Sequence, residues 1–466
     1  LRDLLRDAAV QPVILGGDQV VLAPVRQRAN AEKTAEPVPM LQKIGQLDRV
    51  VVTGSASGAS QRSLPIALDV VTGSQLAQRG AGSLSGALDG DVPGLWIWEQ
   101  SPLSLFAAYG SIRGASSFGV SYPKVYIDGI EAANSLLVTH LDPESISRIE
   151  VIRGPQGAAL YGADAISGVM NIITRQDGAE AGAPRGQFRT QGGETSSDYS
   201  ANGVLAQSHA LSLGYGSGVR SGRVGMTLTS IGAFIPQAYS QQLTANGGFR
   251  MVGSKSVITG TARFFAQDAR TPASPLLASL NLMQRQPVMS YDSSSQHRLD
   301  SPSQLAITDS SDRQSVRQYT VGATGTFHQS DRWTHTAVAG IDGYRLKTGS
   351  ILDGAFPSAV DSALRAATGN ALRASLRASS VAQFGSEEKA AATVTLAAEH
   401  SYFRDVTRAP GLFSPDPVAQ GASAPAVVET STNTGLIAQV NTGFRNAVFL
   451  SGGMRVERNT GVTGLG

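Results

Sequence analysis

Strict alternation of residue types marks the second part of the chain, from about residue 179 onward. In residues 319–328, one set of alternate positions holds Tyr, Val, Ala, Gly and Phe, and the other holds Thr, Gly, Thr, Thr and His. Successive side chains of a β-strand point to opposite faces of a sheet, so a period of two predicts strands. This part of the chain is therefore expected to fold as β-sheet.

Short turns join some of these alternating stretches in pairs. Residues 319–328 lead through Gln329-Ser330-Asp331 into 333–346, and 436–444 lead through Arg445-Asn446 into 448–456. Weaker alternating stretches cover 204–215, 224–234, 257–267 and 394–403, and long polar stretches cover 287–318 and 410–432. Strands of about 9–11 residues with short turns at one end and long loops at the other are typical of outer-membrane barrels. A soluble β-sandwich also alternates, but its strands are usually about 5–6 residues long, so strand length favours the barrel.

Composition narrows the function further. No stretch of about 20 apolar residues is present, so a membrane would have to be crossed by a closed sheet rather than by a helix. The formal net charge is +2 with no long run of one sign, which argues against a nucleic-acid partner. There is no Cys, the six His lack metal-ligand spacing, and the glycine-rich stretch 154–162 lacks the Lys and Ser/Thr of a phosphate-binding loop. We therefore expect that the protein binds no metal or cofactor, has no catalytic residues and is not an enzyme.

Residues 49–178 are expected to form a compact α+β unit. Strands are predicted at 49–53, 125–127, 149–152 and 169–174, and short helices at 75–79, 84–89, 143–146 and 157–161. Before this unit, residues 1–23 predict a helix and two strands joined by Gly16-Gly17-Asp18, and 24–48 predict a linker. The chain begins with Leu1 and ends at Gly466, and we expect that both ends continue in a longer protein.

The glycine-rich segment IEVIRGPQGAALYGADAISGVMNIIT spans 149–174. Gly154 is expected to end a strand and start a turn, and Gly157 to let a short helix begin close to the sheet. Gly162 is expected to stop that helix in a left-handed conformation, and Gly168 precedes the next strand. The segment thus predicts a strand, a turn, a short helix, a loop and a second strand.

This segment closely resembles the end of the plug domain of TonB-dependent receptors. Four upstream segments match other parts of that domain in order: VVVTGS at 50–55, ALDGDVPGL at 87–95, SIRGAS at 111–116 and VYIDGI at 125–130. The resemblance implies an α+β plug domain at 49–178 followed by an antiparallel transmembrane β-barrel, incomplete in this chain, at 179–466. Within the motif, Tyr161 and Asn171 are implied to be structural residues alongside the four glycines.

Resemblance also bears on the two ends of the chain. Residues 434–460 look like a middle-barrel hairpin of the SusC/RagA-type branch, and 1–23 resemble the end of the small secretin/TonB N-terminal domain. The family's barrel has roughly 22 strands around a plugged lumen, and 179–466 hold about eight to twelve. A half-barrel leaves two unpaired edges, so this fragment is not expected to insert into a membrane alone.

Two arginines and one short extended run are the candidate contact residues that the resemblance implies. Arg113 and Arg153 match plug arginines that face barrel carboxylates in relatives, although both could be ordinary solvated arginines. The second candidate is the TonB-contact run Val50, Val51, Val52 and Thr53. Such a β-branched run suits strand addition by TonB. It is equally well the first plug strand, and the TonB box would then lie in 24–48.

Two further groups have a structural and a functional interpretation. Tyr126, Asp128 and Gly129 are expected to form a structural hairpin. Trp96 and Trp98 flank a plug turn, where core packing or loop anchoring is favoured over contact with a ligand.

The function that the resemblance implies is import across the outer membrane of a Gram-negative-type bacterium. The substrate would be a ferric siderophore, cobalamin, or an oligosaccharide or peptide. Its partners would be TonB with its inner-membrane energising complex, outer-membrane lipid and, in a SusC-like protein, a surface lipoprotein. Two alternatives stay open: a receptor that signals through its N-terminal domain, and a surface β-protein with an adhesive or enzymatic role.

Overall fold

A computed structural model describes the fold of two compact units, Leu1–Lys43 and Ile44–Gly466. The described residues are 10–14, 20–24, 67–79, 83–88, 90–99, 108–112, 123–154, 157–162, 165, 167–176, 183–197, 203–235, 238–272, 310–352, 367–386, 389–408, 426–445 and 447–460. In the first unit, β1 (Val10–Ile14) and β2 (Val20–Pro24) form an antiparallel hairpin, which confirms the two strands predicted there. The helix predicted before them lies outside the described residues.

The α+β part of the second unit, residues 67–176, is called the plug below. Its five-stranded sheet has the order β3-β8-β9-β6-β7, in which β9 pairs antiparallel with β8 and parallel with β6. The strands are β3 (Leu68–Thr72), β6 (Lys124–Ile127), β7 (Ile130–Glu131), β8 (Ile146–Arg153) and β9 (Gly168–Thr174), and a separate hairpin comprises β4 (Leu95–Glu99) and β5 (Ala108–Ile112). The helices are α2 (Gly73–Gln78), α3 (Leu84–Leu88), η3 (Ser135–His140), η4 (Pro143–Ser145) and α4 (Ala158–Tyr161).

Local chemistry explains where these short helices begin. At α2, the Thr72 side chain accepts from the Gln75 N–H while the Gln75 side chain accepts from the Thr72 N–H, which is a capping box. At η4, Asp142 accepts from the Glu144 N–H and Pro143 occupies the first turn. The predicted N-terminus at Asp142 is confirmed, although the helix is a single 3-10 turn.

The plug has an apolar core of its own. Leu76, Leu84, Ile112, Ile149 and Ile172 are fully buried within it. All members of this main cluster come from the plug, so the plug has an apolar core separate from the wall. The strand β3 was missed by the sequence prediction, whereas the strand predicted at 49–53 lies outside the described residues.

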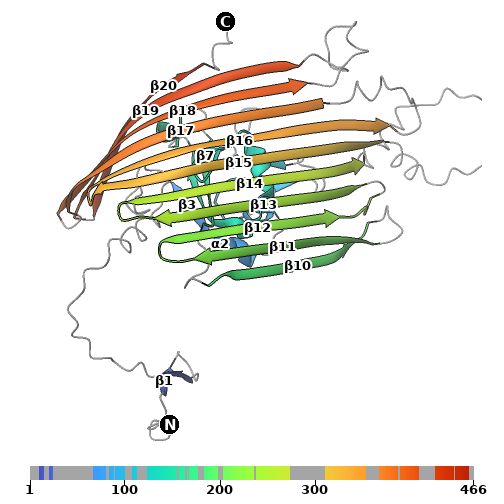
Figure 1. Ribbon diagram of the computed structural model, residues 1–466, viewed down its shortest axis with the longest axis horizontal. Helices are drawn as coiled ribbons and strands as arrows, with labels where there is room; N and C mark the ends of the chain where they lie inside the picture. Colours follow the sequence, from blue (N-terminus) through green and yellow to red (C-terminus); the bar gives the residue numbers. More distant parts are fainter. Residues whose placement is uncertain are drawn as a thin grey trace, which may run out of the picture. The chain divides into compact units, whose positions relative to one another are not determined.

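The rest of the second unit is one antiparallel sheet of eleven strands in sequence order, called the wall below (Figure 1). Its strands are β10 (Arg185–Thr195), β11 (Val204–Gly216), β12 (Arg220–Ile231), β13 (Tyr239–Val252), β14 (Ser256–Pro272), β15 (Ser310–Ser330), β16 (Trp333–Leu352), β17 (Ala367–Ser386), β18 (Ala390–Arg408), β19 (Val427–Phe444) and β20 (Val448–Asn459). The sheet is not closed, and β10 and β20 are its edges. Among the residues described, no helix combines the length and the apolar character that crossing a bilayer requires.

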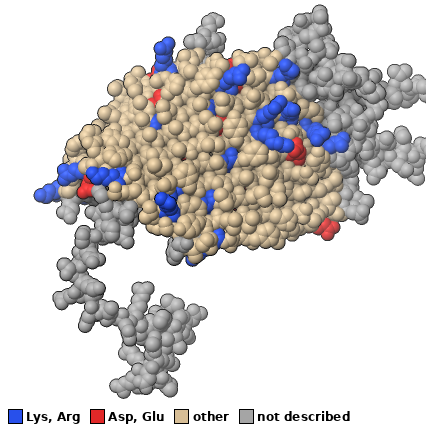
Figure 2. All heavy atoms as spheres, in the orientation of Figure 1, with Lys and Arg blue, Asp and Glu red and all other residues tan. Residues whose placement is uncertain are grey.

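The two faces of the wall differ in polarity. On β15, Val321 is 46% exposed on the outer face, whereas its neighbour Thr320 is 1% exposed on the face that the plug contacts. Gln318 is also buried on the inner face, and Tyr319 and Phe327 are exposed on the outer one. Figure 2 views the outer face, much of which carries no charge. An apolar exterior and a polar interior are the reverse of a soluble sandwich and fit a membrane barrel.

Strand lengths differ from the prediction. β15 has 21 residues and β16 has 20, well above the predicted length of about 9–11. β15 begins at Ser310 and β19 at Val427, so these two strands extend into the stretches 287–318 and 410–432 that were predicted as loops. The prediction missed β10, β13 and β17, where glycines or charged residues interrupt the alternation and inter-strand hydrogen bonds still continue the ladder.

Candidate functional site: the contact between plug and wall

A pair of glycines in the wall receives one apolar side chain of the plug. Gly322 of β15 and Gly340 of β16 lie opposite each other, and Ile130 of β7 fills the space above them. A Cβ atom would lie 2.1 Å from the Ile130 Cδ1 atom at Gly322 and 2.5 Å from its Cγ1 atom at Gly340. Neither position can hold a side chain while the plug sits here, so this is a close steric fit.

Asp342 of β16 holds the plug backbone beside this fit. Its Oδ1 atom accepts from the Ala133 N–H at 2.7 Å, and its Oδ2 atom accepts from the Thr320 hydroxyl at 2.6 Å. The Arg263 guanidinium donates to the same hydroxyl at 3.2 Å. Asp342, Thr320 and Arg263 are all buried. A buried carboxylate with these donors is satisfied only while the plug supplies its N–H.

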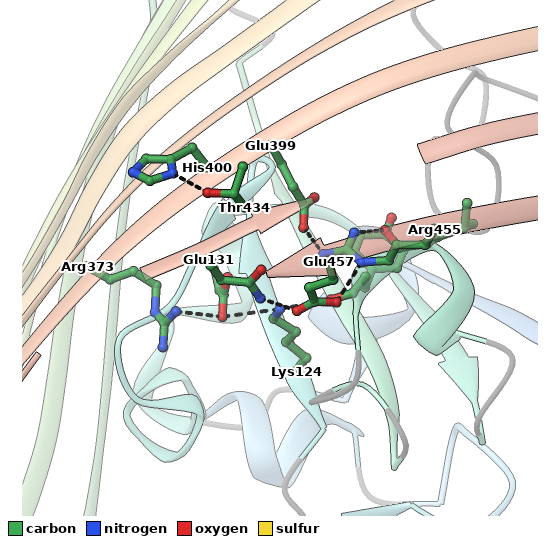
Figure 3. Close-up of polar contacts among 11 residues, drawn as sticks. Lys124, Glu131, Arg373, Glu399, His400, Thr434, Arg455 and Glu457 are labelled. Atoms are coloured by element: carbon green, nitrogen blue, oxygen red, sulfur yellow. Dashed lines mark hydrogen bonds and ion pairs between the residues drawn. The ribbon is translucent and has the colours of Figure 1, made fainter. Parts of the chain in front are cut away.

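Glu131 of the plug lies between two cations, one from the plug and one from the wall (Figure 3). Its Oε1 atom is 3.0 Å from an Arg373 nitrogen of β17 and 3.5 Å from the Lys124 Nζ atom. Lys124 also donates to the Tyr161 carbonyl at 2.9 Å. Glu131 and Lys124 are buried, and their pairing offsets the cost of removing charge from water.

Arg455 of β20 is the centre of a second charged group (Figure 3). It pairs with Glu399 of β18 and, at 2.8 Å, with Glu457. It also donates to the Leu160 carbonyl of the plug at 3.1 Å. Gly162, which ends α4 with φ +90°, lies so close that a Cβ atom there would be 2.7 Å from a Glu457 oxygen. Arg455 thus ties the plug motif to the wall.

Two tyrosines of the plug pack together next to these groups. The Tyr126 and Tyr161 rings have centroids 5.1 Å apart, and the Arg377 guanidinium of β17 lies 5.4 Å from the Tyr161 centroid. Burial raises the pKa of both tyrosine hydroxyls, with Glu131 adding to the effect at Tyr126. Both side chains are therefore neutral at physiological pH.

Asp128 forms the turn of the β6–β7 hairpin with φ +50°, as the predicted Asp-Gly turn requires. Its carboxylate accepts from the Thr174 N–H at 2.8 Å and from the Thr174 hydroxyl at 2.6 Å. Burial raises the pKa of Asp128, and the Thr174 and Thr261 hydrogen bonds and the Arg263 charge oppose that rise. Thr261 and Arg263 belong to β14, so this structural hairpin also meets the wall.

The wall strands β10 and β12 contact the plug through η4. Arg189 pairs with Glu144 at 2.6 Å, and the Thr227 hydroxyl donates to Asp142 at 2.8 Å. Asp142 therefore caps the 3-10 turn with one oxygen and binds the wall with the other. Polar contacts thus reach the plug from both halves of the wall.

Other residues singled out from the sequence have the following places. Arg153 pairs with Asp69 at 2.5 Å and donates to the Pro93 carbonyl, both within the plug, so its contact with the barrel stays a prediction. Gly154 follows β8, Gly157 precedes α4, Gly168 begins β9, and Asn171 is buried in β9. Trp96 is 64% exposed on β4, and Trp98 lies on the same strand. Arg113, Val50, Val51, Val52 and Thr53 lie outside the described residues.

The wall side of the site was missed by the sequence prediction. Asp342 and Arg455 stand in alternating strands at positions that the period of two assigns to the inner face, and that period could have marked both as inward charges. Arg373 lies in β17, where the alternation is interrupted, and it carried no such signal. The period of two could not have named a plug partner more than 200 positions away, such as Ala133 for Asp342.

Comparison with known proteins agrees with this geometry. The family model of the TonB-dependent Receptor Plug Domain matches residues 60–169. The vitamin B12 transporter BtuB of Vibrio vulnificus (strain CMCP6) is 33% identical over 145 residues, which are 30% of this chain and 23% of that protein.

Solved structures of two receptors share the fold. The RagAB peptide importer in its open-open state has a TM-score of 0.66 at 14% identity, covering 88% of this chain and 56% of that chain. The ferripyoverdine receptor of the outer membrane of Pseudomonas aeruginosa has a TM-score of 0.62 at 15% identity, covering 99% of this chain and 59% of that chain. The chain thus spans little more than half the length of these two structures.

These relatives confirm the predicted fold class, the outer-membrane location and the prediction that the chain is not an enzyme, since they are receptors and transporters. The plug motif, the separate plug core and the wall with its apolar exterior all belong to one architecture. Residues 60–169 thus match the plug domain of TonB-dependent receptors, and the described part of the chain joins this plug to eleven strands of a sheet that shares the fold of the two solved structures.

Proposed function

We propose that the full-length protein imports a nutrient across the outer membrane, with the plug blocking the lumen until TonB displaces it. The observation that carries this proposal is the difference between the plug's interior and its contact with the wall. The main apolar core lies wholly inside the plug. Among the residues that the structure describes, the wall adds Ala397 and Ile437 to one smaller cluster, and a few residues around Leu137 to another.

The contact with the wall is otherwise largely polar. The Glu131–Arg373 pair, the Asp342–Ala133 hydrogen bond and the Arg455–Leu160 hydrogen bond join plug to wall. Separating such groups in a dry interface is costly, but water that enters can solvate them again. A plug held in this way stays seated at rest and can move as a unit under force.

TonB would supply that force through an extended segment ahead of the plug. Val50, Val51, Val52 and Thr53 are the proposed TonB contact, because strand addition uses backbone groups of a β-branched run. A segment within residues 24–48 is the alternative. Arg113 and Arg153 stay proposed plug–barrel contacts.

The substrate belongs to one of the classes that the names of the relatives suggest. BtuB is a vitamin B12 transporter, RagAB is a peptide importer and the Pseudomonas protein binds ferripyoverdine. We therefore propose cobalamin, a ferric siderophore, or an oligosaccharide or peptide. If the protein is SusC-like, as the RagAB likeness suggests, a surface lipoprotein would be a further partner.

Uptake measurements test this proposal. A strain that lacks the full-length gene is compared with wild type for uptake of labelled cobalamin, ferric siderophores and oligopeptides, with and without a protonophore. We expect that uptake of one substrate class is lost in the deletion strain and is also lost in wild type treated with the protonophore. Unchanged uptake of every class in the deletion strain, or uptake that survives loss of TonB, would contradict the proposal.

The variant Val51→Pro locates the TonB contact. Proline removes a backbone donor and should block strand addition, so uptake falls while ligand binding at the cell surface is kept. If residues 50–53 instead form a plug strand, the variant lowers the amount of receptor in the outer membrane. Val51→Ile is the matched control and should leave uptake and receptor level unchanged.

Signalling is the second candidate function, and the separate unit Leu1–Lys43 with its β1–β2 hairpin favours it. Deletion of residues 1–43 should then abolish any substrate-dependent change in transcript levels while import continues. Loss of import alone would exclude this role.

A further inference from the structure

An apolar groove crosses the outer face of the wall over β10–β15. Its volume is about 790 Å³, and its lining is almost wholly apolar. Gly222, Gly247 and Gly260 form part of its floor, and Val224 and Phe249 form part of its sides. Register confirms that these residues share one face, because Gly222 faces Phe249, Phe249 faces Gly260, and Val224 faces Gly247.

The groove opens at the end of the wall that carries the short turns. The β11–β12 and β13–β14 connections are residues 217–219 and 253–255, only a few positions from the Gly222 and Phe249 row. Short turns mark the periplasmic side of an outer-membrane barrel. The groove therefore lies at the level of the periplasmic leaflet.

Two exposed cations stand where the groove meets this end. Arg220 begins β12 and points to the same outer face as Gly222 and Val224, because alternate residues of a strand share one face. Lys255 lies in the β13–β14 turn. Arg220 is opposite Met251, which is opposite Ile258, so an apolar row continues beside the cations. Residues 214–225 and 247–262 contain no Asp or Glu that would neutralise them.

We propose that this groove binds an anionic phospholipid of the periplasmic leaflet. One acyl chain lies along the groove, and the phosphate lies between Arg220 and Lys255. Three observations support this occupant: the groove is continuous with the lipid-facing outer face, its lining suits hydrocarbon, and two exposed cations, Arg220 and Lys255, stand at its open end. Unstructured contact with bulk lipid would require neither the groove nor the matched cations.

Native mass spectrometry of the purified full-length receptor tests the proposal. The receptor is exchanged from detergent into mixtures of phosphatidylglycerol and phosphatidylethanolamine, and the lipid retained on activation is counted. Wild type should retain one phosphatidylglycerol in preference to phosphatidylethanolamine. The double variant Arg220→Gln/Lys255→Gln should lower that retention by at least about tenfold, because each cation near a membrane surface strengthens binding of anionic lipid.

A second pair of variants tests the groove itself. Gly222→Leu and Gly247→Leu fill it, and both should fold, since an added Cβ atom would meet its nearest neighbours at ordinary distances of 3.5 and 3.6 Å. Each should lower phosphatidylglycerol retention. Gly325→Leu is the matched control, because Gly325 shares the outer face on β15, has nothing within 4 Å of an added Cβ and does not line the groove.

Heat-modifiable migration on gels confirms that each variant is folded. Equal retention of both lipids by wild type would overturn the proposal, as would unchanged retention in the double variant. A bound protein subunit in place of lipid would also overturn it. The variant Arg220→Lys/Lys255→Arg keeps both charges and should keep the preference for phosphatidylglycerol.

Discussion

Ile130 of the plug and Gly322 of the wall approach so closely that a Cβ atom on Gly322 would lie 2.1 Å from the Ile130 Cδ1 atom. This single contact sets the depth of the plug at β15. The contact is steric and apolar, whereas its neighbours Asp342 and Arg373 hold the plug by charge. The two kinds of contact can be tested separately.

Gly322→Ala should loosen the seat of the plug. The added methyl group clashes with Ile130, and overpacking of this kind costs about 1–3 kcal/mol. Cells that carry the variant full-length receptor should become more sensitive to a large antibiotic that normally cannot cross the outer membrane. The double variant Gly322→Ala/Ile130→Ala removes the clash with Ile130, whereas the Ala339 carbonyl oxygen stays 2.9 Å from the added Cβ atom, so resistance should be restored in part. Leakage equal to that of the single variant would show that contact with Ile130 does not control the seat of the plug.

Arg455→Met should weaken the contact between the wall and the glycine-rich plug segment 149–174. The Arg455 side chain is 6% exposed, and its removal leaves the partly buried carboxylates of Glu399 and Glu457 without their cation. Breaking a buried pair costs about 3–5 kcal/mol. The expected result is a higher open-channel conductance in planar bilayers.

The exposed pair Arg317–Asp268 is the matched control for Arg455. It joins β14 and β15 within the wall, and such pairs contribute at most about 1 kcal/mol. Arg317→Met should leave the conductance at the wild-type level. Equal effects of the two variants would mean that general barrel stability, rather than the seat of the plug, controls conductance.

Gly162→Ala should disturb the plug more than Gly90→Ala. Both glycines have positive φ, Gly162 at +90° with ψ 176° and Gly90 at +77°, so an alanine strains the backbone at either position by about 1–3 kcal/mol. Only at position 162 would the new Cβ also meet the wall, at the Glu457 carboxylate. Leakage of large solutes in cells should therefore rise clearly for Gly162→Ala. If both variants leak equally, backbone strain alone explains the requirement for glycine.

Asp128 should make the stability of the plug depend on pH. Burial raises its pKa in the folded state above the unfolded value. The folded state then binds a proton more tightly, so the contribution of Asp128 becomes more favourable as pH falls through the raised pKa and is lost again as pH rises. Thermal unfolding of the full-length receptor, followed by tryptophan fluorescence between about pH 4 and 7, measures this change.

Asp128→Asn is the comparison for that measurement. Asparagine tolerates the positive φ of the turn and keeps an oxygen that accepts from the Thr174 N–H. The stability of wild type relative to this variant should rise as pH falls. A difference that is constant with pH would exclude Asp128 as the titrating group.

Local sequence pattern predicted several of the elements of this protein, although not β3, β10, β13 and β17. Alternation in 319–328 predicted β15, the Asp142-Pro143-Glu144 sequence predicted the start of η4, and the Asp128-Gly129 turn predicted the β6–β7 hairpin. Each depends on neighbours only a few residues apart, because strand period, helix caps and turns are set by adjacent backbone and side-chain geometry.

Strand ends and plug–wall partners required the folded chain. β15 starts inside a stretch that is polar in sequence, because pairing with β14 and β16 satisfies its backbone groups whatever its side chains are. The Leu160 carbonyl and Arg455 are 295 positions apart, and no local pattern relates them. Arg455 finds its charged partners, Glu399 and Glu457, within the wall, but it reaches the Leu160 carbonyl only when the wall packs against the plug, since a hydrogen bond depends on distance in space and not along the chain.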